Sequence, residues 1–254
     1  MNGNETITDT HAHLCDSIFE SDRAEVIERA GSAGIKNILC VGEDLSDAQK
    51  NIELALKYPG LRPAAGLFPS NLDMKKAYDV LDFIKENRDK LFAVGEVGLD
   101  YWLIKEESQR ALQREIFGMF IKLAEDMDLP LNVHSRSAGR QTVELLIDHN
   151  ARRVQMHAFD GKVSSAMPAV EAGFFFSVPP SIVRSRQKQK LCRQLPMSCL
   201  LIESDSPVLG PDQGKRNEPA NAMLALKAIA DLKEIGEREV MKAIAENTRC
   251  LYGH

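Results

Sequence analysis

Two histidines separated by a single residue, His11 and His13, follow the run Ile7-Thr8-Asp9-Thr10 near the start of the chain. Side chains of a β-strand alternate between its two faces, so this spacing places both imidazoles on the same face. Neutral imidazole nitrogen is a good ligand for zinc, manganese and iron. The pair by itself is a weak signal, because single histidines are more often ordinary core or surface residues. A metal site is predicted only if further ligands converge on the pair.

Four more ionisable residues lie within or at the end of short apolar runs, and they are Glu96, His134, His157 and Asp205. Each one alone has an ordinary explanation: a lone histidine is more often a hydrogen-bonded core residue, and a buried glutamate can pair with an arginine. All of them together are less plausibly structural, because buried charge is costly unless it is paired or bound to a metal. We therefore expect one or two divalent ions. The first would be held by His11, His13, Glu96 and Asp205, and the second, about 3.5–4 Å away, by Glu96, His134 and His157.

The elements that must position these side chains are strands and helices in alternation. Eight strands are expected, at the first histidine pair and at residues 36–42, 61–67, 92–99, 129–134, 153–157, 174–178 and 200–205. Helical periodicity covers residues 21–33, 47–58, 77–84, 112–127, 142–149, 220–232 and 237–248. Ser21 and Ser46 are the expected N-caps of the first two helices.

This alternation predicts an α/β protein with a parallel sheet. Dividing 254 residues by eight gives about 32 residues per unit, which is typical of a (β/α)8 TIM-type barrel. A doubly wound open sheet is the competing architecture, and it would carry a glycine-rich turn after the first strand. That position holds His11-Ala12-His13-Leu14, so a barrel formed by residues 1–254 as a single domain is favoured. All strands of such a barrel end on the same face, where the six candidate ligands would converge.

The composition is that of an ordinary globular protein, with 44% hydrophobic and 27% charged residues and a net charge of -5. Five cysteines without close pairing are typical of reduced thiols. We find neither a signal peptide nor an apolar run of membrane-spanning length. The expected location is therefore intracellular, cytoplasmic or nuclear, with no membrane association and no obligate protein partner.

Several motifs resemble those of the TatD family of metal-dependent deoxyribonucleases, within the amidohydrolase-like barrels. The similar stretches span nearly the whole chain in the same order: Asp9-Thr10-His11-Ala12-His13-Leu14, Gly95-Glu96-Val97-Gly98-Leu99-Asp100-Tyr101, Val133-His134-Ser135-Arg136, His157-Ala158-Phe159-Asp160-Gly161, Glu203-Ser204-Asp205-Ser206-Pro207, Arg216-Asn217-Glu218-Pro219 and Glu246-Asn247-Thr248-Arg249. The resemblance implies a distorted (β/α)8 barrel, one or two divalent ions (Zn, Mn or Mg), and hydrolysis of DNA phosphodiesters. It also implies the same six metal ligands: His11, His13, Glu96, His134, His157 and Asp205.

The chain departs from the family pattern at three positions, Ala12, Ala158 and Asp160, where the family often has cysteine or serine. None is a ligand position, so we expect activity to be retained. Asp160 adds a negative charge near a site for an anion, and this leaves the substrate preference open.

Two acids on the last predicted strand are the candidate catalytic residues. Asp205 would act as the general base that takes a proton from the attacking water, and Glu203, two residues earlier, would assist proton transfer or order the ligands. Glu203 could equally have only a supporting role, as an acid that pairs with a positively charged group and takes no part in proton transfer.

Candidate substrate contacts follow the strands. Arg136 and the pair Arg216 and Asn217 could bind phosphate, and Tyr101 or the neighbouring Trp102 could stack on a base, although Trp102 could equally be a packing residue. The basic run Arg184, Arg186, Lys188 and Lys190 could follow a DNA backbone, but such runs are more often the solvated face of a helix.

Two other functions are compatible with these residues. A related barrel could hydrolyse a small amide, ester or lactone with the same metals, although many such sites use a modified lysine where this chain has Glu96. Alternatively, the barrel could bind nucleic acid or protein without turnover, and the loss of a ligand would support that, yet all six are present.

Overall fold

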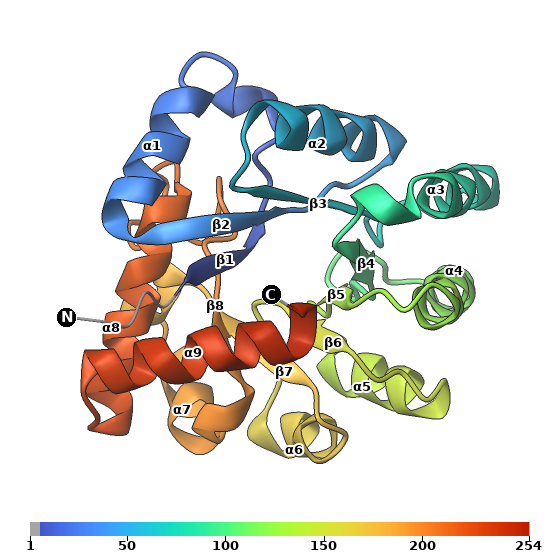
Figure 1. Cartoon of the computed structure of the whole chain (residues 1–254). Coiled ribbons are helices and arrows are strands. Elements are labelled where there is room, and N and C mark those ends of the chain that lie inside the picture. Colours follow the sequence, from blue (N-terminus) through green and yellow to red (C-terminus); the bar gives the residue numbers. More distant parts are fainter. Residues whose placement is uncertain (1–5, 254) are drawn as a thin grey trace.

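Eight parallel strands follow one another in order around a barrel in this computed structural model, which describes residues 6–253 (Figure 1). The strands are β1 (Ile7–Ala12), β2 (Ile35–Cys40), β3 (Leu61–Ala65), β4 (Ala93–Gly98), β5 (Leu131–His134), β6 (Val154–Met156), β7 (Phe175–Val178) and β8 (Leu200–Ile202). The predicted (β/α)8 barrel of a single domain is confirmed.

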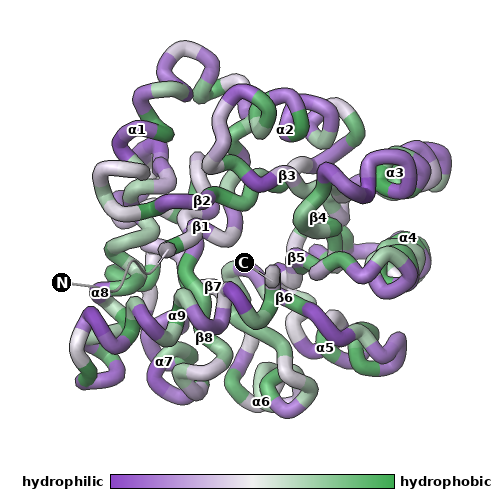
Figure 2. The backbone as a smooth tube through the Cα atoms, viewed as in Figure 1, coloured by the Kyte–Doolittle hydropathy of each residue, from purple (hydrophilic) through white to green (hydrophobic). Residues whose placement is uncertain are grey.

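Within residues 6–253, seven helices connect successive strands: α1 (Arg23–Ala33), α2 (Leu45–Lys57), α3 (Met74–Glu86), α4 (Glu107–Asp126), α5 (Gly139–Asp148), α6 (Val163–Glu171) and α7 (Arg186–Gln194). Two more, α8 (Ala222–Lys233) and α9 (Glu237–Tyr252), follow the last strand. Figure 2 shows hydrophilic residues on the outer helices, most clearly on α3, and hydrophobic residues on strands such as β4. Among the described residues, no helix combines the length and apolarity that a membrane crossing requires.

The barrel closes between β8 and β1 largely through side chains and the residues that follow the strands. Thr10 Oγ1 donates to Ile202 O at 2.9 Å, and the Asp9 carboxylate accepts from Ser204 N at 2.7 Å. Beyond the strand ends, Asp205 N donates to His11 O at 2.9 Å. This closure joins the segment of the first histidine pair directly to the segment that contains Asp205.

Two predicted helix starts are wrong. Asp22, and not Ser21, is the N-cap of α1, and its carboxylate makes no capping bond because it pairs with Arg216. The N-cap of α2 is Asp44, which accepts from Asp47 N at 3.1 Å, so Ser46 lies inside the helix. Helix α6 was not predicted, because Pro168 lies within it and interrupts the expected pattern.

The end of α9 closes the amino-terminal end of the barrel. A small apolar cluster forms there and in the barrel interior, and it consists of Leu39, Val41, Ala64, Ala93, Leu201, Leu251 and Tyr252. Figure 1 shows α9 crossing that end, with its last turn near the middle of the ring of strands. Arg153, just before β6, fixes this turn by donating to Leu251 O at 2.9 and 2.8 Å. The opposite, carboxyl-terminal end of the barrel is the one that carries the candidate ligands.

Gly98, the last residue of β4, is required where that strand approaches His134. Its φ is +144°, and a Cβ atom there would overlap the His134 carbonyl group. We expect Gly98→Ala to lower the free energy of unfolding by about 2–4 kcal/mol, because it adds backbone strain to a steric clash. Chemical denaturation measures this change.

Gly31→Ala is the matched control. A Cβ atom at this position of α1 has no neighbour within 4 Å, so alanine should raise the free energy of unfolding by about 0.5–1 kcal/mol. Equal stabilities of the two variants would contradict the role assigned to Gly98.

Candidate metal centre

The Glu96 carboxylate lies at the middle of the six predicted ligands and is almost fully buried. Its Oε1 atom is 2.7 Å from His134 Nδ1 and 3.0 Å from His157 Nε2. Its Oε2 atom is 3.4 Å from His13 Nε2 and 3.8 Å from His11 Nε2. One carboxylate from β4 therefore faces all four imidazoles, two with each oxygen.

Asp205 completes the cluster from the other side. His11 Nε2 lies 3.2 Å from His13 Nε2, and Asp205 Oδ1 lies 3.4 Å from the first and 3.8 Å from the second. Two groups of three residues offer ligand atoms that all lie within 4.8 Å of one another, namely His11, His13 and Asp205, and His11, Glu96 and His157. The structure thus brings the six residues together as the sequence analysis expected of a metal site.

The hydrogen bonds of Asn132 determine which nitrogen of His11 carries its proton. Asn132 Nδ2 donates to the Thr10 carbonyl at 2.9 Å, so its Oδ1 atom faces His11 Nδ1 at 2.7 Å and must accept. The proton is therefore on Nδ1, and the Nε2 lone pair of His11 points into the cluster. There it meets another imidazole nitrogen and carboxylate oxygens, an arrangement of electron-pair donors that a divalent cation fits.

Asp100 fixes the ring of His134 in a similar way. Its Oδ2 atom lies 3.0 Å from His134 Nε2, while Oδ1 accepts from Trp102 N at 2.9 Å and Leu103 N at 2.7 Å. His134 Nδ1 is thereby directed toward Glu96. The same carboxylate also holds the segment after β4 in place, so that segment and the His134 ring are positioned together.

The pKa directions reflect burial opposed by charge. Burial raises the pKa of Asp205 to about 7, and the neighbouring Glu203 and Glu96 act in the same direction. Burial also lowers the basicity of His157, but the carboxylates of Glu96 and Glu203 outweigh it and raise the pKa of His157 well above its usual range. Without a cation, burial and the neighbouring charges thus favour the protonated forms of Asp205 and His157.

Both carboxylate oxygens of Glu203 accept their hydrogen bonds from neutral donors. Its Oε1 atom accepts from Ala158 N at 2.8 Å, and Oε2 accepts from the Ser177 hydroxyl at 2.5 Å. The nearest imidazole nitrogen, His157 Nδ1, is 3.7 Å from Oε2 and has no hydrogen-bond partner among residues 6–253. Glu203 therefore lies beside the cluster, next to His157.

The Ser177 hydroxyl continues into a chain of polar side chains inside the barrel. Gln155 Nε2 donates to Ser177 Oγ at 2.8 Å, and the Tyr252 hydroxyl donates to Gln155 Oε1 at 2.5 Å. Tyr252 also accepts from Asn132 Nδ2 at 3.4 Å. Buried hydrogen bonds thus connect the end of α9 with both Glu203 and His11.

Two of the predicted phosphate-binding residues make extensive bonds within the protein. Both terminal nitrogens of Arg216 bond to the Asp22 carboxylate, at 2.8 and 2.5 Å. Asn217 is buried and donates to Ser204 O at 2.7 Å and Val208 O at 2.8 Å. They tie the segment after β8 to α1 and to itself.

The segment after β4 presents a different arrangement. Tyr101 is buried, with its hydroxyl accepting from Arg114 at 3.0 Å. Trp102 is 52% exposed, and the guanidinium of Arg136 lies 3.8 Å from its ring centroid. Arg136 forms no ion pair within the described part of the chain. Among the predicted contacts, Arg136 thus keeps its charge available next to an exposed aromatic ring.

Sequence reasoning gave no role to Asn132 or Asp100. Asn132 carries a usable signal, because a polar residue two positions before His134 in an apolar strand lies on the same face as that histidine. Asp100 lies in a quoted motif, but its partner His134 comes from another strand, so only the fold reveals the pair.

Comparisons with known proteins agree with this geometry. A family model described as TatD related DNase matches residues 8–253. A human protein named deoxyribonuclease TATDN3 is 40% identical to the chain, and the match covers 97% of this chain and 94% of that protein. An uncharacterized metal-dependent hydrolase of Bacillus subtilis, YabD, is 34% identical, with 96% and 98% covered.

A solved structure is similar over its whole length. The crystal structure of YjjV, a TatD homologue from Escherichia coli, superposes with a TM-score of 0.91 at 27% identity, and the match covers 99% of this chain and 100% of that chain.

Metal binding should weaken as the pH falls. Asp205, with its pKa raised to about 7, and His157, with its raised pKa, hold protons in the metal-free protein near neutral pH. Ligands must lose their protons to bind a cation, so Mn²⁺ affinity should fall about tenfold or more between about pH 8 and about pH 6. Titration calorimetry in buffers of different ionisation enthalpy measures the affinity and the released protons. A pH-independent affinity without proton release would contradict this assignment.

Asn132→Leu should weaken metal binding by about 10–100-fold, because it removes the acceptor that orients His11. Asn247→Leu is the matched control, since Asn247 is also a mostly buried asparagine, and it donates to Met197 O and Leu200 O at 2.8 Å each. Both variants should lose about 1–3 kcal/mol of unfolding free energy, but only the first should lose metal affinity. Equal metal affinities, measured by chelator competition, would refute the orienting role.

Proposed function

The chain belongs to the TatD family of metal-dependent hydrolases, and on this basis we propose that it is a divalent-metal-dependent deoxyribonuclease that hydrolyses DNA phosphodiester bonds. We propose His11, His13, Glu96, His134, His157 and Asp205 as the ligands of one or two ions, with zinc, manganese and magnesium as the candidates. The supporting observation is the convergence of four imidazoles and two carboxylates on one buried point at the carboxyl ends of the strands.

Phosphodiester hydrolysis requires a nucleophile, neutralisation of the phosphate charge and a group that takes up a proton. When bound, a divalent ion lowers the pKa of water and neutralises negative charge on phosphate oxygens. The residues of the chain hold the ion, orient the reactants and move the proton. Burial of this centre strengthens each of these electrostatic interactions relative to water.

Asp205 is the proposed general base. Its Oδ1 atom lies 3.4 Å from His11 Nε2 and 3.8 Å from His13 Nε2, so the carboxylate borders the proposed metal site, where it could take up a proton from the attacking water. Its backbone has φ +52°, an unusual value for a residue other than glycine, and its N–H donates to His11 O at 2.9 Å. Glu203 keeps two neutral donors on its oxygens and is proposed to order His157 and to accept a proton transiently.

The rim around the centre favours a substrate with flat apolar faces. Eight large apolar side chains are exposed in the described residues, and five of them lie on segments that follow strands at this end of the barrel: Ile18, Trp102, Leu103, Val183 and Val208. Exposed aromatic rings stack on nucleobases, and arginine binds phosphate. The stacked pair of Arg136 and Trp102 supports a nucleic acid over a small polar amide.

The test is metal-dependent release of nucleotides from DNA, run beside a panel of cyclic amides and lactones. Measured at matched metal content, because Asp205 is also a proposed ligand, Asp205→Asn should lower kcat on DNA by about 10²–10⁴-fold through loss of the proton acceptor. Asp212→Asn, an exposed aspartate after the same strand that pairs with Lys215 at 2.9 Å, should leave kcat unchanged.

Turnover of the amides or lactones without turnover of DNA would replace the proposal with a small-molecule hydrolase. Binding of DNA without any metal-dependent turnover would indicate a non-catalytic barrel.

A further inference from the structure

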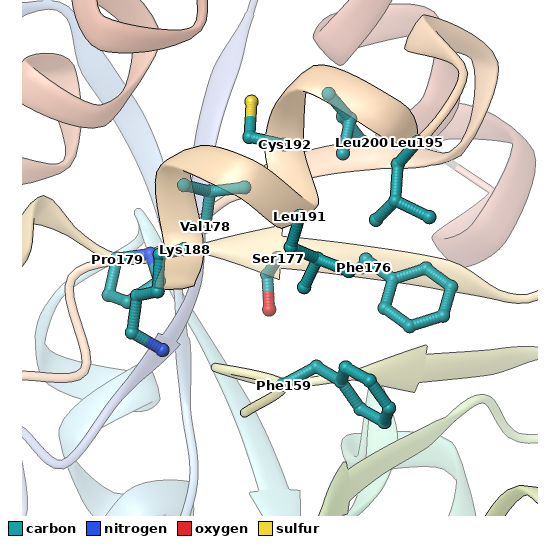
Figure 3. A pocket seen from close by; sticks show the side chains of 10 residues that line it. All are labelled: Phe159, Phe176, Ser177, Val178, Pro179, Lys188, Leu191, Cys192, Leu195 and Leu200. Carbon is teal, nitrogen blue, oxygen red and sulfur yellow. The ribbon is translucent and has the colours of Figure 1, made fainter. Parts of the chain in front are cut away.

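Lys188 in α7 differs from the other cations of its basic run in where its side chain ends. Arg186 and Lys190 are exposed, whereas Lys188 is partly buried and its ammonium donates to Ala158 O at 2.9 Å. Figure 3 shows its nitrogen on the side of a small pocket opposite to Phe176 and Leu195. The hydrocarbon stem therefore borders apolar side chains, and the charge reaches the segment that follows β6.

Ala158 connects this ammonium to the candidate metal centre. It directly follows His157, its carbonyl accepts from Lys188, and its N–H donates to Glu203 Oε1 at 2.8 Å. Its φ of +43° is uncommon for a residue with a side chain. The two ends of one residue therefore hold a cation and an anion next to a proposed ligand.

The charge of Lys188 is not paired within the protein. Among residues 6–253, no carboxylate forms an ion pair with it, and its hydrogen bond to Ala158 uses one of three N–H donors. Burial lowers the pKa of Lys188, while Glu203, Asp205 and Asp160 oppose this by favouring the charged form. A cation with donors to spare thus lies within electrostatic reach of the proposed base.

The Asp160 carboxylate, an acid near Lys188, forms its hydrogen bonds with a different partner. The Asp160 carboxylate accepts from Ser137 N with both oxygens, at 3.2 and 3.1 Å. This bond ties the segment after β6 to the segment after β5. Asp160 is therefore positioned as part of the rim without forming an ion pair with Lys188.

We propose that Lys188 forms an anion subsite beside the metal centre and binds a phosphoryl oxygen of phosphate esters. This inference rests on the proposed function, and it makes Lys188 a substrate-binding residue supplied by α7. The ligand class is phosphate mono- and diesters, and inorganic phosphate is the smallest probe of the subsite. A lysine acts there as a point charge with rotatable donors, which is suited to an oxygen that changes position during the reaction.

The experiment measures inorganic phosphate binding to the metal-loaded protein by titration calorimetry, at matched metal content. Lys188→Met should weaken phosphate binding at least about tenfold, which is the effect expected of a lost charge-assisted hydrogen bond. Lys188→Arg keeps the charge and should retain more of the affinity than Lys188→Met. Metal affinity, measured separately, should be the same in all variants.

Lys233→Met is the matched control. Lys233 is also partly buried and also donates from Nζ to backbone carbonyls, those of Arg193 and Leu195, but at the far end of α7. Its loss should leave phosphate binding unchanged. Wild-type phosphate affinity in Lys188→Met, or a loss of metal affinity that accounts for the weaker phosphate binding, would overturn the proposal.

The same protein samples separate this inference from the proposed function. If the wild type binds phosphate through Lys188 but releases no nucleotides from DNA, the deoxyribonuclease proposal fails and the anion subsite stands. If DNA is hydrolysed and Lys188→Met has wild-type KM and phosphate affinity, the subsite fails alone.

Discussion

The rest of this structure must place compensating groups around one buried carboxylate, that of Glu96. Its two oxygens face four imidazoles from three different parts of the barrel. A charge in the interior is costly unless it is compensated, so the strands that carry these groups must keep a fixed register. Asp9 and Thr10 contribute to that register, because their side chains bond β1 to β8 where the barrel closes. The centre and the closure of the barrel are therefore parts of the same arrangement.

A layer of neutral polar side chains inside the barrel supports the charged centre. Asn132, Gln155, Ser177 and Tyr252 form directed hydrogen bonds that end on His11 and Glu203. Because Asn132 in this layer donates through Nδ2, its Oδ1 atom accepts from His11 Nδ1, and the His11 Nε2 lone pair is directed toward the cluster. The proposed substrate contacts lie outside this buried centre: Arg136 and Trp102 are on segments that follow strands, and Lys188 is in α7. In the proposed function, residues on and directly after the strands would thus supply the chemistry, and the surrounding segments and α7 would supply recognition.

The sequence was sufficient for the barrel and for the convergence of the six candidate ligands, because both depend on local periodicity and on the common direction of parallel strands. His11 and His13 share a face for that reason. The roles of the basic residues could not be predicted, because they depend on distant partners. Arg216 bonds to Asp22, which lies far away in the sequence and is the N-cap residue of α1. Lys188 belongs to a run of cations that look alike in sequence, and only the orientation of α7 distinguishes it.

The donor atoms gathered around Glu96 are proposed to bind a divalent cation. The most direct measurement is anomalous diffraction from crystals grown with Mn²⁺ or Zn²⁺, collected at the absorption edge of the metal. We expect peaks at about 2.0–2.2 Å from His nitrogens and carboxylate oxygens of this cluster, with Glu96 or Asp205 in contact with each ion. Anomalous peaks only at other positions, with the six side chains still arranged as described, would contradict the account.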